Sequence, residues 1–282
     1  MLGIFLAMFG AIVLVFADSL KGQFGRHISY KLVIWNTVLV GVVIGAIASV
    51  LMGATITAPV YLLWLPISIL LLVLGEVTFI KSLIHGDFSE VAPIRAVAPV
   101  FSLFLAMLFL GEIPSVLSMF GVMLIVGGVW AISVSDIKSG GLKLSPGVKY
   151  MICSQFFGVL LGITIKIAST GVSPLIYFTL VMVGEWIYFS FAILHGRIPP
   201  LALFRHDPVR ATVMSMLWGI GILAVSIAPA YTLVSYAYAS SQIYLPVSLL
   251  VSGYWLKEQK AFARLKPGAI LLAGVALVIL GA

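Results

Sequence analysis

The stretch that decides the fold is APVFSLFLAMLFLGE, Ala98 to Glu112, because a similar stretch, LPVSLLVSGYWLKE, occurs at Leu245 to Glu258. In both stretches a proline opens an apolar run that ends in a glutamate. Helix-breaking residues recur around them at one constant offset: Pro99, Gly121 and Gly127 correspond to Pro246, Gly268 and Gly274. Matched breakers at a fixed spacing indicate an internal duplication.

The composition around this repeat is that of a membrane protein. Of the 282 residues, 62% are hydrophobic and 9% are charged, whereas soluble domains average roughly 25% charged residues. A membrane-spanning helix needs roughly 20 apolar residues. Ten such runs are predicted, at residues 2–18, 31–52, 60–84, 90–110, 115–134, 148–168, 173–195, 210–230, 233–256 and 265–282. We therefore expect an all-α integral membrane protein with ten transmembrane helices.

The ten runs divide into two units of five, residues 1–134 and 145–282, within a single transmembrane domain. Because five is an odd number, the second unit must be inverted relative to the first. Inverted repeats enclose a central cavity near the middle of the membrane and allow one conformation open to each side. This arrangement predicts a transporter.

The basic residues predict the orientation in the membrane. The chain has 16 Lys and Arg, and all but Lys81, Arg95 and Lys166 lie in or beside loops that follow odd-numbered spans. The positive-inside rule places these loops in the cytoplasm and both termini outside the plasma (inner) membrane. The net charge of +7 is thus explained by topology, and no nucleic-acid partner is expected.

Residues 90–133 carry a family resemblance. Pro99, the helix end Leu110-Gly111-Glu112 and the glycine-rich span that follows resemble the EamA-like ten-helix branch of the drug/metabolite transporter superfamily. The second copy, residues 241–281, is similar except that Leu256-Lys257-Glu258 replaces Leu-Gly-Glu. The resemblance implies ten helices around a central cavity and transport of metabolites such as amino acids, sugars, nucleotide conjugates or amines. It also implies cytoplasmic termini, and here we follow the charge distribution instead.

Charges of both signs flank the turn between the third and fourth predicted spans. Glu76 and Arg95 are equally distant from this turn, and so are Lys81 and Glu90. In an antiparallel helix hairpin, equal distance means equal depth, so two ionic rungs are predicted. A lone charge near mid-membrane costs at least about 2.5–3.5 kcal/mol. Glu76, Lys81 and Arg95 are therefore candidate substrate-binding residues; alternatively, the pairs only fix the register of the helices.

Two further ionisable residues lie in the second half. Glu185 occupies the centre of the seventh predicted span. Burial disfavours the charged form of a carboxyl, so Glu185 is a candidate for proton coupling; the alternative is a neutral acid that serves helix packing. Lys166, at the end of the sixth span, is a candidate gate or anion-attracting charge. The alternative for Lys166 and for its counterpart Lys21 is a side chain that extends to the membrane interface.

The run YTLVSYAYASSQIYLP, Tyr231 to Pro246, predicts part of a cavity wall. Tyr236 and Tyr244 lie on one helical face with a serine between them, and Gln242 lies on an adjacent face. A tyrosine ring combines apolar contact with a hydroxyl group, as a mixed cavity wall requires. Tyr236, Gln242 and Tyr244 are therefore candidate substrate-binding residues.

The matched breakers predict mechanical roles. Pro99 and Pro246 each remove one helical hydrogen bond, which makes them candidate hinges. The glycines of the fifth and tenth spans allow close helix packing, either within one molecule or across a homodimer.

Features of other protein classes are lacking in the sequence. The four histidines do not have metal-ligand spacing, and the single cysteine, Cys153, cannot form an internal disulfide. A phosphate-binding loop, a nucleophile elbow and a pair of catalytic acids are all missing. We expect no enzyme activity, no cofactor and no metal, with a small solute and the lipid bilayer as partners.

The sequence thus predicts a secondary transporter of small polar or amphipathic metabolites that works by alternating access. Charges of both signs in its cavity suit an amino-acid-like or zwitterionic solute. The alternative is a membrane scaffold or accessory subunit whose charges only fix helix packing.

Overall fold

The computed structural model describes residues 1–111, 115–134, 145–258 and 265–281. The described residues are helical apart from short connections and one isolated antiparallel bridge between Ile56 and Val172. Within them, seven helical segments are long and apolar enough to cross a membrane: Leu2–His27, Tyr30–Leu51, Pro59–His85, Phe88–Leu110, Pro146–Ala168, Pro174–His195 and Pro208–Tyr231. The chain is an α-helical, multi-pass integral membrane protein.

The helices follow the predicted runs closely. In the first half they are α1 (Leu2–His27), α2 (Tyr30–Leu51), η1 (Pro59–Trp64), α3 (Leu65–His85), α4 (Phe88–Val91), η2 (Ala92–Val97), α5 (Ala98–Leu110) and α6 (Val116–Val134). In the second half they are α7 (Pro146–Ala168), α8 (Pro174–His195), α9 (Ala202–His206), α10 (Pro208–Ile227), η3 (Ala228–Tyr231), α11 (Val234–Ser240), η4 (Ser241–Ile243), α12 (Tyr244–Leu250), η5 (Val251–Trp255) and α13 (Leu265–Leu280).

One predicted boundary is wrong. The first span was expected to end at residue 18, but α1 continues to His27. The polar residues Asp18 and Lys21, which interrupt the apolar run, are buried within the helix. They remain in the membrane because other helices supply partners for their charges, and these partners are far away in the sequence.

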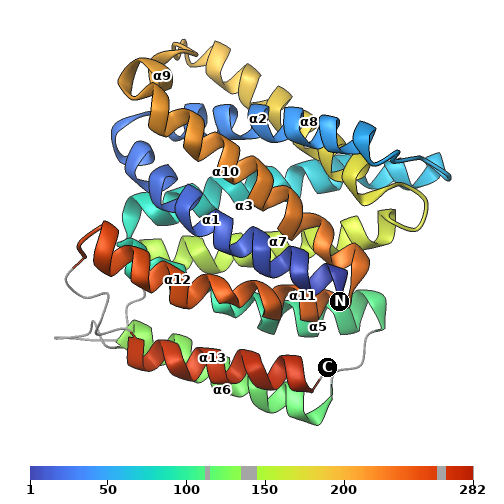
Figure 1. Ribbon diagram of the computed structural model, residues 1–282, viewed down its shortest axis with the longest axis vertical. Helices are drawn as coiled ribbons and strands as arrows, with labels where there is room; N and C mark the ends of the chain where they lie inside the picture. Colours follow the sequence, from blue (N-terminus) through green and yellow to red (C-terminus); the bar gives the residue numbers. More distant parts are fainter. Residues whose placement is uncertain (112–114, 135–144, 259–264, 282) are drawn as a thin grey trace.

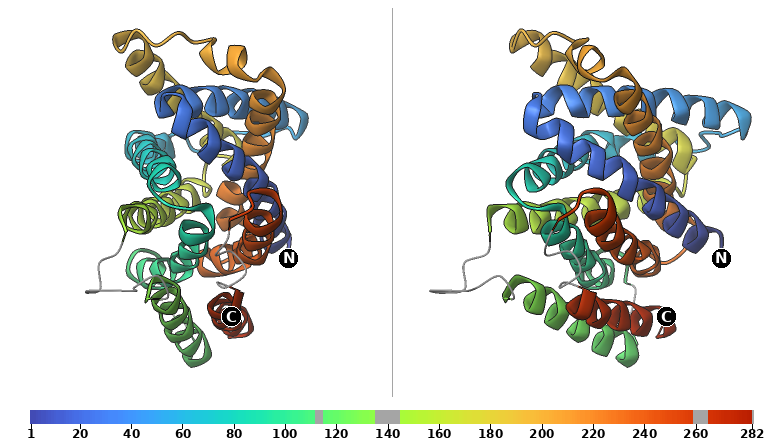
Figure 2. Two further views of the ribbon diagram at one scale, coloured as in Figure 1. Left: turned by 90° about the vertical axis from the view of Figure 1, so that its left-hand side faces the viewer. Right: turned by 60° about the vertical axis from the view of Figure 1, so that its left-hand side comes forward.

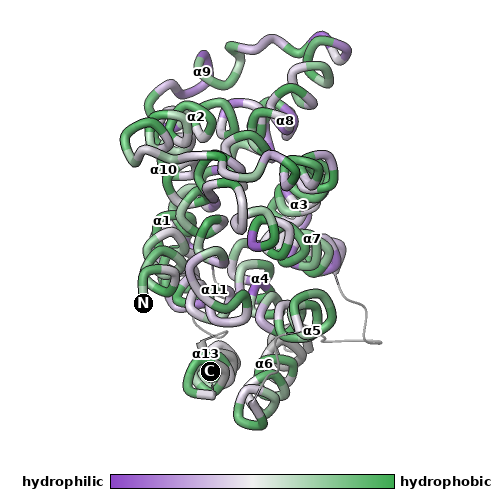
Figure 3. Tube along the Cα trace, turned by 90° about the vertical axis from the view of Figure 1, so that its right-hand side faces the viewer, coloured by the Kyte–Doolittle hydropathy of each residue, from purple (hydrophilic) through white to green (hydrophobic). Residues whose placement is uncertain are grey.

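The main helices pack in pairs that join the two halves of the chain. α1 packs against α10, α3 against α7, α2 against α8, and α6 against α13 (Figure 1). Both termini lie on the same face of the bundle, and α6 and α13 form a separate pair at one end of it (Figures 1 and 2). The trace is mostly hydrophobic, with hydrophilic positions in the loop around α9 and at isolated points inside the bundle (Figure 3).

Two of these pairs depend on glycine. A Cβ atom at Gly274 of α13 would lie 2.6 Å from the carbonyl oxygen of Gly121 in α6, and one at Gly10 of α1 would lie 2.6 Å from that of Gly221 in α10. Only glycine permits backbones to approach so closely. The glycines of α6 and α13 therefore act within one molecule, and the homodimer stays a prediction.

The two helical segments that contain the candidate hinge prolines, Pro99 and Pro246, are both interrupted. The 3₁₀ segment η2 lies between α4 and α5, and η4 lies between α11 and α12. Pro99 stands in the first turn of α5, directly after η2, whereas Pro246 lies inside α12. A 3₁₀ turn inside a helix often marks a hinge or local strain. The hinge role of the two prolines stays a prediction.

Candidate functional site

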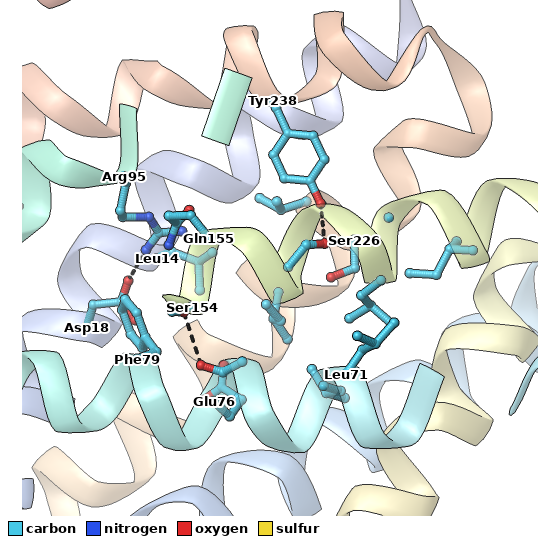
Figure 4. A pocket seen from close by; sticks show the side chains of 18 of the residues that line it. Leu14, Asp18, Leu71, Glu76, Phe79, Arg95, Ser154, Gln155, Ser226 and Tyr238 are labelled. Carbon is cyan, nitrogen blue, oxygen red and sulfur yellow. Dashed lines mark hydrogen bonds and ion pairs between the residues drawn. The ribbon is translucent and has the colours of Figure 1, made fainter. Parts of the chain in front are cut away.

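A cavity of about 100 Å³ lies between elements from both halves of the chain (Figure 4). Its walls come from α1, α3 and η2 of the first half and from α7, α10 and α11 of the second. The polar residues among those that line it are Asp18, Glu76, Arg95, Ser154, Gln155, Ser226 and Tyr238. Leucines, isoleucines, glycines and aromatic rings supply the rest of the wall.

The first charged pair of the cavity joins α1 to η2. The guanidinium of Arg95 lies 2.8 Å from Oδ2 of Asp18, and the two side chains face each other in Figure 4. Tyr244 of α12 donates its hydroxyl to the same oxygen at 3.0 Å. The Arg95 guanidinium also lies 4.1 Å from the centroid of the Tyr244 ring. The Asp18 carboxylate thus has two donors, and Arg95 has both an ion pair and a cation–π contact.

The second charged pair joins α1 to α3. Lys21 donates to Oε2 of Glu76, and the Lys21 side chain is fully buried. Its ammonium lies 4.5 Å from the centroid of the Trp218 ring in α10. Glu76 lines the cavity and Lys21 lies behind it, so the cavity faces the carboxylate of this pair. A buried charge is tolerated only when it is paired in this way.

The opposite wall, formed by α7 and α11, is polar and closely packed. Ser154 donates to the carbonyl oxygen of Gly75 at 3.0 Å, and Tyr238 donates to that of Gly158 at 2.6 Å. A Cβ atom at Gly162 would lie 2.6 Å from the Tyr238 hydroxyl. Glycine at this position therefore makes the room that the Tyr238 side chain occupies in the wall.

The cavity extends from the charged pairs toward the face that carries the termini. Its lining residues Ile165, Val225 and Ser226 lie near the ends of α7 and α10 on that face. On the other side of the charged layer lies a crevice made of two adjoining pockets, of about 370 and 330 Å³, which share Arg26 and Arg210. Asp87 and Glu258 also line the first of them. The layer of paired charges therefore separates the cavity from this crevice.

A carboxylate joins the two halves on the side of the crevice. The two oxygens of Glu258, just after η5, accept hydrogen bonds from the backbone N–H groups of Phe88 (2.9 Å) and Ser89 (2.7 Å) at the start of α4. The ring of Phe88 contacts that of Tyr244, with 6.4 Å between centroids. This contact places a second, aromatic layer beneath the Asp18–Arg95 pair.

The predicted rungs between the third and fourth spans are wrong. Glu76 pairs with Lys21 and Arg95 pairs with Asp18. The equal-depth argument assumed two regular helices, whereas the 3₁₀ segment η2 contains Arg95 and changes the direction of its side chain. It also left out α1, which supplies both partners.

The second predicted rung is replaced by separate contacts. The Lys81 ammonium lies 5.9 Å from the centroid of the Tyr30 ring and 5.6 Å from that of Tyr150. Glu90 accepts a hydrogen bond from Ser145 at 2.7 Å. Neither Lys81 nor Glu90 is among the described residues that line the cavity.

Of the three candidate residues predicted between Tyr231 and Pro246, Tyr244 contacts the charged site, at the Asp18–Arg95 pair, as described above. Gln242 is buried and donates to the backbone oxygen of Tyr238 at 3.1 Å, one turn earlier in its own span. Neither Gln242 nor Tyr236 is among the described lining residues.

Lys21 and Lys166, which occupy corresponding positions in the two predicted halves, have different environments. The expectation that Lys21 extends to the interface is wrong, since Lys21 is fully buried in its ion pair. Lys166 donates to the backbone oxygen of Thr232 at 3.2 Å, near the face that carries the termini. Its role as a gate stays a prediction.

Glu185 is fully buried in α8. Neither of its carboxyl oxygens has a hydrogen-bond partner among the described residues, and the described lining of the cavity does not include it. The sequence prediction placed Glu185 at the centre of its helix correctly, but it gave no information on which charges surround it.

Sequence reasoning missed five polar residues of the site: Asp18, Ser154, Gln155, Ser226 and Tyr238. For Asp18 a signal existed, because it stands three positions before Lys21 and so lies on the same helical face. The two wall residues of α7 had no such signal, because isolated polar residues in an apolar helix commonly bond to their own backbone.

The fold and the cavity define an α-helical multi-pass membrane protein with a charged site between its halves. Residues 1–134 match the family model of the EamA-like transporter family. The resemblance carried by the motifs is thereby confirmed over residues 1–134, which are similar to a family of membrane transporters.

Comparison with solved structures extends the likeness to the whole chain. A crystal structure of another protein is similar over 99% of this chain and 96% of its own, with a TM-score of 0.62 and 15% sequence identity. At this identity the similarity shows the fold alone. The comparison with curated protein sequences gives no match.

Proposed function

We propose that this protein is a secondary transporter that moves small zwitterionic metabolites, of amino-acid-like chemistry, across the plasma membrane by alternating access. The observation that carries the proposal is a cavity between the two halves that presents both Arg95 and the carboxylate of Glu76. Sites for small molecules are concave, mostly apolar and furnished with a few polar groups, and this cavity has those properties.

The size of the cavity limits the solute. Its volume is about 100 Å³, whereas sites for drug-sized ligands are roughly 300–1,000 Å³. A nucleotide conjugate would need far more space than this cavity provides. Among the substrates implied by the family, an amino acid or another small zwitterion fits best.

The paired charges give the solute a way to bind without leaving a buried charge alone. A solute carboxylate can take the place of Asp18 on Arg95, and a solute ammonium can take the place of Lys21 on Glu76. Breaking a buried pair by removing one partner costs about 3–5 kcal/mol. The displaced Asp18 and Lys21 stand three positions apart on α1 and can then pair with each other. Such an exchange of partners avoids most of the cost, and it favours a solute that carries both charges over a simple ion.

The pattern of helix pairs supports two inverted units, residues 1–134 and 145–282, with ten spans. If α1 and α7 are equivalent, and likewise α3 and α10, then the pair α1–α10 maps onto the pair α7–α3. The pairs α2–α8 and α6–α13 map onto themselves. A twofold axis in the membrane plane relates contacts in this way, and such folds alternate between two openings.

The position of the cavity indicates the side of the membrane to which this conformation is open. The cavity extends toward the face with the termini, while Glu258 and the aromatic layer close the other face. By the positive-inside rule, the closed face is cytoplasmic. In this proposal the conformation is open toward the outside.

One observation favours a second candidate, a scaffold in which the charges serve packing. Both ion pairs are satisfied by protein groups alone, as a purely structural role would require. The two candidates differ in flux, because only the transporter moves a solute.

Uptake by purified protein in proteoliposomes tests the proposal. With a mixture of radiolabelled amino acids, we expect saturable uptake that the double variant Glu76→Gln/Arg95→Gln abolishes. The matched control is Asp207→Asn, because Asp207 is a surface residue that pairs with the exposed Arg210; this variant should transport like the wild type. Absence of saturable uptake in the wild type would favour the scaffold.

A further inference from the structure

The buried charges around the cavity do not balance. In the described residues, the cluster contains three carboxyl groups, Asp18, Glu76 and Glu185, and two cations, Lys21 and Arg95. Asp18 and Glu76 each have a cation, whereas neither carboxyl oxygen of Glu185 has a hydrogen-bond partner within the part of the chain that the structure describes. If all five groups were charged, the cluster would carry one surplus negative charge in a region of low dielectric constant, at high cost.

Glu185 belongs to this cluster by position. The helix α3, which carries Glu76, packs against α8, which carries Glu185. Met182, one turn before Glu185 in α8, and Trp218 of α10 both lie against Gly41 of α2. The Lys21 ammonium lies 4.5 Å from the centroid of the same Trp218 ring. Glu185 thus lies in the same buried layer as the ion pair of Lys21.

Other charges are too far from Glu185 to balance it. The helices packed against α8 are α2, α3, α7 and α10. α3 contributes Glu76 and also Lys81, which lies near its end with its ammonium against the rings of Tyr30 and Tyr150. The remaining three helices carry their basic residues near their ends: Lys31, Lys149, Lys166 and Arg210. Glu185 lies at the middle of α8, so these cations do not face it.

We propose that Glu185 binds a coupling proton, and that this proton competes with the ammonium group of the solute for the surplus negative charge of the cluster. The inference rests on the proposed function, since it assigns the coupling ion of the same site. It predicts exchange, in which a proton moves in one direction and a cationic or zwitterionic solute in the other.

Lys21 connects the two ligands. When Glu185 holds the proton, the Lys21 ammonium pairs with Glu76 alone, as in the structure. When Glu185 gives its proton to water, Lys21 lies between two carboxylates and neutralises Glu76 only in part. Glu76 lines the cavity, so its carboxylate then becomes available to a solute ammonium.

A measurement on the proton alone tests the assignment without knowledge of the solute. Infrared difference spectra of the purified protein in lipid, recorded on raising the pH, should show loss of the C=O stretching band of a protonated carboxyl. Glu185→Gln should abolish this change. Asp207→Asn, an acid-to-amide change at the surface, should leave it as in the wild type.

Glu76→Gln provides the sharper test, because Glu185 itself remains. This variant removes the surplus charge, so Lys21 becomes free to pair with an ionised Glu185, and the band of the protonated carboxyl should be lost. The proposal is overturned if the wild type shows no such band, or if the band persists in Glu185→Gln or in Glu76→Gln.

Transport assays distinguish a failure of this inference from a failure of the proposed function. In proteoliposomes loaded with the amino-acid mixture, Glu185→Gln should exchange solute at a rate independent of pH and should lose accumulation driven by a pH gradient. Accumulation at the wild-type level in Glu185→Gln would overturn the inference while the proposed function stands. If the wild type itself exchanges no amino acid, the proposed function fails, and the infrared result still decides whether Glu185 holds a proton.

Discussion

Each charge that lines the cavity is held by a partner on another helix. Asp18 receives both the guanidinium of Arg95 and the hydroxyl of Tyr244, and Lys21 combines its ion pair with the ring of Trp218. Charge-assisted hydrogen bonds are stronger than neutral ones, and a buried ion left without them is costly. The same contacts thus stabilise the fold and keep the charges available to a solute.

Removal of Asp18 should show this cost. Asp18→Asn leaves Arg95 without its carboxylate, and we expect a loss of about 3–5 kcal/mol in the free energy of unfolding. The double variant Asp18→Asn/Arg95→Gln should recover part of that loss, because neither charge then remains alone. Thermal unfolding in detergent measures both effects.

The exposed pair Asp207–Arg210, with 3.4 Å between charged atoms, is the matched control. Surface pairs contribute about 0–1 kcal/mol, so Asp207→Asn should change stability little. Equal losses for Asp18→Asn and Asp207→Asn would mean that the cavity pair lies in a solvated, high-dielectric environment.

At the residue scale, the sequence identified two charged residues that line the cavity, Glu76 and Arg95, but not their partners. Glu76 and Arg95 were identified because charges inside apolar runs are rare and face the protein interior. Their partners could not be predicted from the hairpin alone, because Asp18 and Lys21 reach them from α1, more than 50 positions away in the sequence. Pairing between distant segments is a property of packing.

At the scale of the elements, α6 and α13 show how glycines allow two helices to approach closely. Gly274 lies against the backbone of Gly121 and Ile125, where a Cβ atom would come within 2.6–2.9 Å of their atoms. The repeated glycines were predicted to permit close packing, and the close contact they make is confirmed within the molecule. Their recurrence at one constant offset in the sequence explains why sequence alone revealed them.

Gly274→Ala should separate these two helices. An added methyl group meets backbone atoms that cannot rotate away, and overpacking of this kind costs about 1–3 kcal/mol. Thermal unfolding should detect the loss. Gly127→Ala, on α6, is the control, because a Cβ atom there meets nothing within 4 Å; an equal effect of both changes would contradict the contact.

Element boundaries followed the hydrophobic runs, apart from the end of α1. The interruptions at η2 and η4 were not predicted as 3₁₀ segments, although the prolines beside them were identified as breakers. A proline indicates where a helix is weakened, but it does not determine which neighbouring turn tightens. That choice depends on the packing of α4 and α12 against the rest of the bundle.

For the whole molecule, the sequence predicted an all-α multi-pass membrane protein, and this is confirmed. Apolar runs separated by short breaks leave few alternatives in a bilayer, since every backbone group must be hydrogen-bonded within its own helix. The shape of the cavity could not be predicted in the same way. It depends on how six elements meet, and small residues such as Gly158 and Gly162 of α7 decide where space remains.

Orientation is a property of the whole chain and can be measured directly. The basic residues predict that the face with the termini is extracytoplasmic. A reporter fused after the last residue, active only outside the cytoplasm, should therefore be active. A reporter fused there that works only in the cytoplasm should be silent, and the reverse pattern would show that the family's usual orientation holds.

The central claim is that the charged cavity opens alternately to the two sides of the membrane. Gln155 lines this cavity, and Cys153 is exposed, so the test uses Gln155→Cys in a Cys153→Ser background. We expect a membrane-impermeant thiol reagent to label this cysteine when it is added to either side of the membrane in separate experiments. Labelling from one side only, or from neither, would contradict alternating access through this cavity.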